Sequence, residues 1–214
     1  MAKNRRNGQR VKRFNQKPNR HLKLGYYSIL TDTDETEKNY FEGLKSSLKE
    51  EYGDKIVISV NKEDTDKLVE SSLSTNPYDV HSRERWIVFD KDEVKNFDDI
   101  IAQAERNGIR VGWSNPCFEI WLHAYYGQMP SSINSQQCCR NFADEYKKKT
   151  NKQYKKSDKR LYRNLLKGGN EEKAIELANQ KHKSCLNDGF KKPSKMSPCT
   201  TVYELVMDIR KKVK

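Results

Sequence analysis

The sequence predicts an α/β protein in which a mostly parallel, four-stranded sheet is followed by a helical C-terminal lobe. In the first half of the chain, short β-prone runs alternate with segments of helical periodicity, an order typical of crossover units that build a parallel sheet. After residue 117 the strand signals stop and only helical segments follow. A chain of 214 residues is long enough for one domain with an added lobe.

The four predicted strands are short runs rich in β-branched and aromatic residues. They cover residues 26–30, 56–60, 85–89 and 109–113. Between them, apolar residues recur at helical spacing, as Tyr40, Phe41 and Leu44 do. The helices predicted between the strands are 36–50, 62–73 and 95–107, and those predicted after them are 117–126, 137–149, 158–167, 171–186 and 200–213.

Charge divides the chain into a mildly acidic body and two cationic segments. Lys and Arg number 42 against 30 Asp and Glu, which gives a net charge of +12. Residues 1–24 carry nine basic side chains and no acidic one, and residues 147–163 carry nine with Asp158 as the single acid. We therefore expect a basic, disordered arm at 1–24, a folded core at 25–126 and a helical lobe at 127–214 that contains the Lys-rich segment.

Both cationic segments are candidates for binding a polyanion such as nucleic acid, and salt should weaken such a complex through counterion release. The arm could also be a solubilising tail. In the second segment, Tyr146, Tyr154 and Tyr162 recur every eight residues. They could stack on unpaired bases, or they could form the core stripe of an amphipathic helix, because eight residues are close to two turns. The candidate nucleic-acid-binding residues are Lys147, Lys148, Lys149, Lys155, Lys156, Arg160 and Arg163.

Composition argues against several classes of protein. No apolar run approaches 18 residues, so the sequence predicts no membrane-spanning helix. The basic N-terminus lacks the apolar stretch of a secretory signal. The five cysteines include no Cys-x-x-Cys pair, which argues against both a disulfide framework and a structural zinc site. We expect reduced thiols in a cytoplasmic protein without a membrane partner.

Acidic residues follow two of the predicted strands. Asp32 comes directly after the first strand, and Asp90 and Asp92 follow the third. The carboxyl ends of parallel strands meet at one edge of the sheet, where doubly wound proteins carry their chemistry. Alternation would place Asp90 and Asp92 on the same side, where each raises the pKa of the other unless a cation lies between them. Carboxylate oxygens suit Mg²⁺ or Mn²⁺, so Asp32, Asp90 and Asp92 are the predicted metal ligands.

The same acids have a structural alternative. Asp90 or Asp92 could simply cap the helix that follows and interact with its dipole. Asp34 and Glu37 likewise have the spacing of residues that cap a helix start. Three convergent carboxylates are harder to explain as caps, and they suit metal-assisted phosphoryl chemistry in a protein that also carries cationic nucleic-acid anchors.

The order strand, acid, helix and then strand with Asp-x-Asp resembles the Toprim core of bacterial primases, of type IA and type II topoisomerases and of several nucleases, so the predicted core is Toprim-like. More closely, the chain resembles the RloB-like family of Toprim proteins over most of its length. The most specific match is residues 115–122, which read Asn-Pro-x-Phe-Glu-x-Trp-Leu. The other matching stretches are 36–41, 88–92, 146–148 and 198–202.

The resemblance implies a Mg²⁺-dependent, nuclease-like protein of restriction-linked and antiphage loci, often with an ATPase partner. Related Toprim effectors of such systems cut tRNA, so the resemblance implies RNA, tRNA included, ahead of DNA as the substrate. Carried onto this chain, it implies Asp32, Glu37 and Glu119 as catalytic residues beside the metal ligands Asp90 and Asp92.

One departure from the family pattern opens a second hypothesis. The family usually places Glu-Gly after the first strand, whereas this chain has Asp32 and Thr33. Asp keeps the charge but is one methylene shorter, and the loss of Gly removes easy access to positive φ. Either Asp34 or Glu35 assists the site, or the protein is a catalytically weakened nucleic-acid-binding or sensor subunit that acts through a partner. In a third alternative, a structural RNA-associated protein, the acids would be incidental.

Two further features have both a structural and a functional interpretation. Asn115 could cap a helix that has Pro116 at its first position, or Asn115 and Glu119 could point at the carboxylates. The family's His after the Trp-Leu run is replaced by Tyr125, and His123 lies two residues earlier. A lone His on a helix is more often structural, so His123 is a weaker candidate for a catalytic role.

Overall fold

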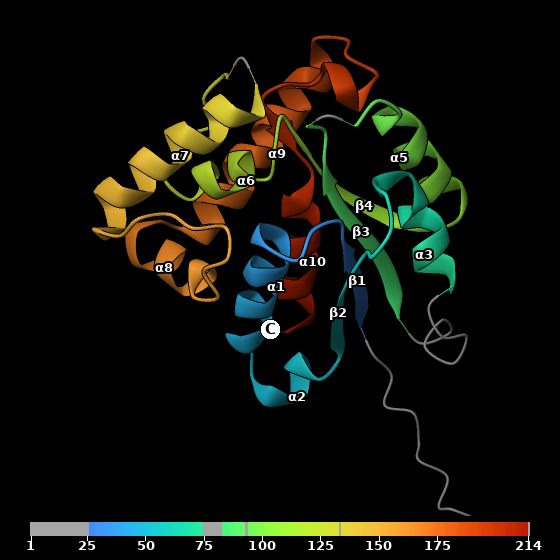
Figure 1. Cartoon of the computed structure of the whole chain (residues 1–214), viewed down its shortest axis with the longest axis horizontal. Coiled ribbons are helices and arrows are strands. Elements are labelled where there is room, and N and C mark those ends of the chain that lie inside the picture. The colour runs from blue at the N-terminus through green and yellow to red at the C-terminus, as the bar shows by residue number, and fades with distance from the viewer. Residues whose placement is uncertain (1–25, 75–82, 93, 133, 214) are drawn as a thin grey trace, which may run out of the picture.

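The computed structural model of the chain describes residues 26–74, 83–92, 94–132 and 134–213 (Figure 1). The predicted basic arm at 1–24 lies outside the described residues. Within them, the predicted α/β class is confirmed, because a mostly parallel sheet has helices on both faces. None of the described helices is long and apolar enough to cross a membrane.

The sheet has the strand order β2-β1-β3-β4-β5, with β1 and β3 adjacent. The four predicted strands are β1 (Tyr27–Thr31), β2 (Ile56–Val60), β3 (Glu84–Asp90) and β4 (Arg110–Asn115), and they run parallel. The predicted number of four strands is wrong by one. A fifth strand, β5 (Cys199–Thr200), pairs antiparallel with the end of β4, and its two residues are too few to give a strand pattern.

Helices connect the parallel strands. They are α1 (Thr36–Ser46), α2 (Glu50–Gly53), the 3₁₀ turn η1 (Thr65–Lys67), α3 (Leu68–Ser74) and α5 (Phe97–Arg106). The helix predicted at 36–50 is therefore split in two. The split follows two serines, because the hydroxyls of Ser46 and Ser47 donate to the backbone carbonyl oxygens of Glu42 and Leu44, and such local bonds favour helix ends over helix interiors.

Alternation along β3 sends side chains to two separate cores. Trp86 and Val88 pack in the core that α1 and the helices of the C-terminal half share, whereas Ile87 and Phe89 pack with α3 and α5. Figure 1 shows α3 and α5 on one side of the sheet and α1 with α10 on the other. The next residue of the first set is Asp90, so this alternation directs its carboxylate to the α1 side.

The second half of the chain folds into further helices, as predicted. They are α6 (Glu119–Ala124), α7 (Ser135–Thr150), α8 (Leu161–Gly168), α9 (Glu171–Asn187), the 3₁₀ turn η2 (Pro193–Lys195) and α10 (Val202–Lys212). Of the two interpretations of Asn115, the helix cap is wrong, and the residue is also not part of the lining of the pocket that holds the carboxylates. Asn115 ends β4, and its side-chain amide donates to the carbonyl oxygens of Pro193 and Ser194, each at 3.2 Å. The helix itself begins only at Glu119.

A polar cluster joins the C-terminal helices to α1. Glu171 of α9 accepts hydrogen bonds from the hydroxyls of Tyr125 (3.0 Å) and Tyr162 (2.8 Å) and from Nε of Arg210 in α10 (2.5 Å). The hydroxyl of Tyr40 in α1 lies 2.7 Å from that of Tyr125. Because a charge that is largely removed from water is tolerated only with partners, this cluster fixes the helices against one another.

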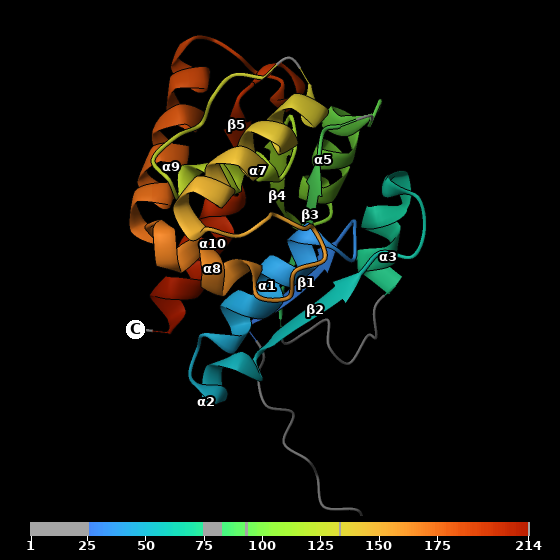
Figure 2. The same ribbon diagram turned by 60° about the vertical axis from the view of Figure 1, so that its left-hand side comes forward.

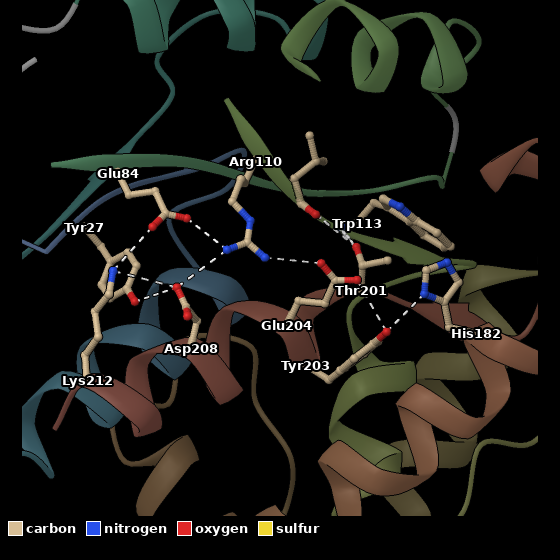
Figure 3. Close-up of polar contacts among 11 residues, drawn as sticks. Tyr27, Glu84, Arg110, Trp113, His182, Thr201, Tyr203, Glu204, Asp208 and Lys212 are labelled. Carbon is tan, nitrogen blue, oxygen red and sulfur yellow. Dashed lines mark hydrogen bonds and ion pairs between the residues drawn. The ribbon is translucent and has the colours of Figure 1, made fainter. Parts of the chain in front are cut away.

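A second polar cluster lies at the amino ends of the strands (Figure 3). Arg110 at the start of β4 pairs with Glu84 at the start of β3 at 2.9 Å, and with Glu204 and Asp208 of α10 at 3.5 Å each. The hydroxyl of Tyr27, at the start of β1, donates to Asp208 at 2.7 Å. The amino ends of β3 and β4 are thus bound to α10 by ion pairs, and that of β1 by a hydrogen bond.

Candidate functional site: an acidic pocket at the carboxyl ends of the strands

A pocket of about 580 Å³ lies at the carboxyl ends of β1 and β3. Most of its charged lining is acidic. The acidic lining residues are Asp32, Glu35, Glu37, Asp64, Asp66, Asp90, Asp92 and Glu119, and the basic ones are Lys95 and Lys156. All five acids that the sequence suggested as catalytic or metal-binding residues therefore share one pocket, although they come from three separate parts of the chain.

The register of the central strands places Asp32 at the pocket. Thr31 pairs with Val88, and the backbone N–H of Asp32 donates to the carbonyl oxygen of Val88 at 3.0 Å. The Asp32 carboxylate accepts a hydrogen bond of 2.9 Å from the hydroxyl of Thr65 in η1. Burial raises the pKa of Asp32, and hydrogen bonds from Thr65 and Asn61 limit the rise. Asp32 is thus held toward the η1 side of the pocket.

Asp90 is the last residue of β3 and lines the same pocket. Its carboxylate accepts the backbone N–H of Phe118, just before α6, at 3.3 Å. Burial raises the pKa of Asp90 well above its usual range, and repulsion from Glu37, Glu119 and Asp92 raises it further. Asp92 is more exposed. The expectation that Asp90 and Asp92 lie on one side of the chain agrees with their place in one pocket.

Two buried glutamates complete the acidic centre. Glu37 lies in the first turn of α1, is 4 % exposed and accepts a hydrogen bond from the hydroxyl of Thr33. Burial, assisted by the charge of Glu119, raises the pKa of Glu37 to about 7. Glu119, the first residue of α6, is 1 % exposed and accepts the hydroxyl of Tyr154 at 2.8 Å. Two such acids are costly to ionise together unless a cation offsets their charge.

The connection between α7 and α8 supplies a counter-charge. The ammonium group of Lys156 lies 3.8 Å from the Glu119 carboxylate. Burial alone would lower the pKa of Lys156, but attraction to Glu119 and to the other pocket acids outweighs burial and raises it. The carbonyl oxygen of Lys156 accepts a hydrogen bond from the Asn39 side chain of α1 at 3.0 Å. Figure 2 shows this connection passing alongside α1.

The three tyrosines of the Lys-rich segment follow neither of the two predicted arrangements. Tyr146 lies on α7 and Tyr162 on α8, and both are buried, so they do not share one helix or face solvent. Tyr154 lies in the connection between these helices, where its hydroxyl lies 3.1 Å from that of Thr36 and donates to Glu119. The eight-residue spacing gave no sign that one of these rings would orient a pocket acid.

The predicted nucleic-acid-binding residues are distributed over several places. Residues 147–149 form the exposed last turn of α7, and Lys155 is exposed in the connection that follows. Lys156 lines the acidic pocket. Arg160 and Arg163 line a second pocket, of about 860 Å³, between α1 and α8 together with two further lysines and three acids. These cations therefore do not form one continuous helical stripe, and Lys156 is the member of the set that lines the acidic pocket.

His123 lies apart from the acidic pocket. It is buried in α6 with its ring 5.3 Å from that of Phe142, centroid to centroid, and is not part of the pocket lining. Burial lowers the pKa of His123, so the ring is neutral near pH 7. This environment favours the structural interpretation of His123 over a catalytic one.

The donor set of the pocket fits a hard divalent cation. Asp32, Asp90 and Asp92 offer carboxylate oxygens, the ligands that Mg²⁺ prefers, and the raised pKa values of Asp32 and Asp90 are those of acids that a cation would stabilise in the ionised form. In the part of the chain that the structure describes, the three carboxylates do not all lie within 4.8 Å of one another. An ion bound by all three would draw them together, and their role as ligands stays a prediction.

The fold and the pocket together define an α/β protein that gathers acids at the carboxyl ends of a mostly parallel sheet. The chain belongs to the RloB-like family, because the family model described as RloB-like protein matches residues 27–209. The family resemblance seen in the sequence is thereby confirmed, and the match includes all five acids discussed above. Comparison with curated proteins gave no match, and neither did comparison with solved structures.

Proposed function

We propose that this protein is a nuclease with a Toprim-like core that cleaves nucleic acid phosphodiesters with the help of Mg²⁺ or Mn²⁺. The observation that supports it most is the convergence of Asp32, Glu37, Asp90, Asp92 and Glu119 in one pocket. Helix capping does not account for this, because acids that serve only stability are normally paired or exposed. Crowded acids with raised pKa values in a cleft are instead typical of functional sites.

The pocket acids divide into two roles. Asp90 and Asp92, together with Asp32, would hold the cation, which when bound would stabilise charge on the phosphate and favour ionisation of water. Glu37 has a pKa of about 7, so both of its protonation states are available near neutral pH. It would exchange a proton with the attacking or the leaving oxygen, and Glu119 would assist it. With RNA, a neighbouring 2′-hydroxyl could replace water as the attacking group.

Lys156 and Tyr154 would position the reacting groups. The Lys156 ammonium lies 3.8 Å from Glu119, where it can contact a phosphate oxygen that enters the pocket. The Tyr154 hydroxyl holds the Glu119 carboxylate in one orientation. Outside the pocket, residues 147–149 and the cations Arg160 and Arg163 of the second pocket would hold the nucleic acid backbone.

The substrate and partner that we propose come from the family resemblance and not from the geometry of the pocket. The resemblance supports RNA, tRNA included, over DNA as the substrate and an ATPase partner in antiphage defence. We include these features, with a cytoplasmic location, in the proposal.

The position of Asp32 supports a second candidate function. Its carboxylate is engaged by the Thr65 hydroxyl on the η1 side of the pocket, and it is one methylene shorter than the Glu usual in the family. A site in which the Asp32 carboxylate does not reach the metal could bind nucleic acid without efficient cleavage. The protein would then be a binding or sensor subunit that acts through a partner.

Cleavage assays test the proposal directly. Purified protein is incubated with labelled tRNA and with plasmid DNA, in Mg²⁺ and in EDTA, as wild type and as an Asp90→Ala/Asp92→Ala variant. We expect Mg²⁺-dependent cleavage that the double variant loses and that Glu50→Gln, an exposed acid of α2, retains. Equal cleavage by wild type and double variant would remove the assignment.

Calorimetric titration separates the two candidate functions. A nuclease of this kind takes up Mg²⁺ or Mn²⁺, and the uptake depends on Asp90 and Asp92. No uptake of either ion, combined with tight and salt-sensitive RNA binding, would favour the weakened binding subunit instead.

A further inference from the structure

Three potential metal-binding side chains lie together beside the acidic pocket. The sulfur atoms of Cys117 and Cys139 and a carboxylate oxygen of Glu119 all lie within 4.8 Å of one another. Cys117 precedes α6, Glu119 begins it and Cys139 lies on α7, so helix packing and not a local turn creates the group. The two cysteines are 22 residues apart in sequence. The Cys-x-x-Cys motif therefore does not identify them as a pair.

The distance between the two sulfur atoms fits a shared metal ion. They lie 3.9 Å apart, well beyond the disulfide bond length of about 2.05 Å. Two thiolates bound to one tetrahedral Zn²⁺, each at about 2.3 Å, would lie about 3.8 Å apart. The Glu119 oxygen is near enough to both sulfurs to be a third ligand, and a site with three protein ligands leaves a fourth position for water.

We propose that Cys117, Cys139 and Glu119 form a binding site for a borderline-soft divalent ion of the Zn²⁺ type, separate from the Mg²⁺ site. Thiolate ligands select such ions over Mg²⁺. The three ionised ligands carry three negative charges, of which the ion offsets two, and the Lys156 ammonium 3.8 Å from Glu119 offsets the third. On binding, the ion replaces two thiol protons, which pass to the buffer.

The surroundings of the three ligands allow an ion to enter. Cys117 and Glu119 are buried and Cys139 is partly buried, and the acidic pocket that Glu119 lines offers an ion a route to the group. Because Glu119 belongs to both sites, a bound zinc ion would withdraw it from the acidic pocket. The zinc site needs only these three side chains, so it does not rest on the proposed nuclease activity.

Cobalt serves as the spectroscopic probe for this site. Reduced, chelator-treated full-length protein is titrated with Co²⁺ in excess Mg²⁺, which occupies carboxylate sites. We expect one equivalent to produce thiolate-to-cobalt absorption in the near ultraviolet, to be displaced by Zn²⁺, and to release two protons. Cys117→Ser and Cys139→Ser should each lose the absorption and bind Zn²⁺ at least about tenfold more weakly. No absorption with reduced wild type would overturn the proposal.

Matched variants distinguish the loss of a ligand from misfolding, and cobalt bound at the cysteines from cobalt bound in the acidic pocket. Cys185→Ser changes a partly buried thiol outside the group and should keep the full cobalt signal. The Asp90→Ala/Asp92→Ala variant should keep it too, even if it abolishes cleavage. Metal-free Cys139→Ser should melt like metal-free wild type, which shows that the lost signal is a lost ligand. Retention of the signal in both Cys117→Ser and Cys139→Ser would also overturn the proposal.

Discussion

Charged side chains are paired at one end of the sheet and crowded with like charges at the other. At the amino ends of the strands, Arg110 pairs with acids of β3 and α10 at 2.9 and 3.5 Å (Figure 3). At the carboxyl ends, Glu37, Asp90 and Glu119 crowd into one pocket, where Lys156 is 3.8 Å from a carboxylate. The pKa values of Glu37 and Asp90 are raised, chiefly by burial and further by repulsion from neighbouring acids.

This difference shows which charges stabilise the fold and which do not. Ion pairs at the amino ends bind α10 to β3 and β4 and each contribute modestly to stability. Crowded acids at the carboxyl ends lower stability, since their ionised forms are desolvated and repel one another. Such an arrangement is expected where a ligand or a reaction requires the acids, and the predictions below test that contrast.

The largest expected effect follows Asp90→Asn. The amide can still accept the backbone N–H of Phe118 but cannot neutralise a cation, so cleavage should fall by at least about a hundredfold, which corresponds to about 2.7 kcal/mol of transition-state stabilisation. The metal-free variant should nevertheless melt at a higher temperature than wild type, because a repelling charge is gone. Cleavage rates and thermal melts are measured on the same preparations. A variant that loses activity and stability together would contradict the contrast between the two ends.

The next effect concerns pH. The folded-state pKa of Glu37 is about 7, above its ordinary value of 4.5, so the folded protein binds more protons than the unfolded chain between these values. The contribution of Glu37 to the free energy of unfolding is therefore fully present below pH 4.5. It is lost as the pH rises through about 7, by up to about 3 kcal/mol. Denaturant titration of metal-free protein at pH 5 and pH 8 should show this loss.

Two comparisons assign that pH effect to the pocket. Glu37→Gln should weaken the dependence but not abolish it, because Asp32 and Asp90 also have raised pKa values, whereas Glu50→Gln, an exposed acid, should leave it intact. Added Mg²⁺ should restore stability at pH 8, since a cation favours the ionised acids. Identical pH profiles for wild type and Glu37→Gln would argue against a raised pKa at this position.

At the amino ends, Arg110→Met should lower stability without changing the chemistry. The substitution leaves Glu84, Glu204 and Asp208 without this partner and removes the guanidinium 4.1 Å from the Trp86 ring centroid. Arg110 is 43 % exposed, so the expected loss is only about 1–2 kcal/mol. Chemical denaturation measures it, and the cleavage rate should match wild type. A loss of activity at equal stability would show that the two ends are coupled.

Part of this contrast could be predicted from sequence because it follows from chain order. Asp32 and Asp90 each follow a run of strand-forming residues, and parallel strands bring their carboxyl ends together. The predicted strands appear as expected, and the acids share a pocket. Residues 199–200 were missed as a strand because two residues are too few to give a strand pattern, and they form a strand by pairing with the distant end of β4.

The rest depends on contacts between distant parts of the chain. Lys156 lines the acidic pocket, and its carbonyl oxygen is bound by Asn39 of the distant helix α1, yet nothing in the local Lys-rich pattern distinguishes it from its neighbours. Asn115 looks like a helix cap, yet carbonyl groups of Pro193 and Ser194, nearly 80 residues further on, bind its side chain. Local pattern identified the residue types, whereas tertiary packing decided their partners.

The smallest expected effect tests whether the connection between α7 and α8 belongs to the functional end. Tyr154→Phe removes a hydroxyl that donates to Glu119 at 2.8 Å and lies 3.1 Å from Thr36. One such bond contributes about 1 kcal/mol, so kcat should fall about fivefold. Because the Tyr154 ring packs against the core and its hydroxyl is directed at Glu119, we expect KM for RNA not to change. Tyr126→Phe is the matched control, since its hydroxyl has no hydrogen-bond partner among the described residues. A raised KM with kcat unchanged would instead place Tyr154 in substrate binding.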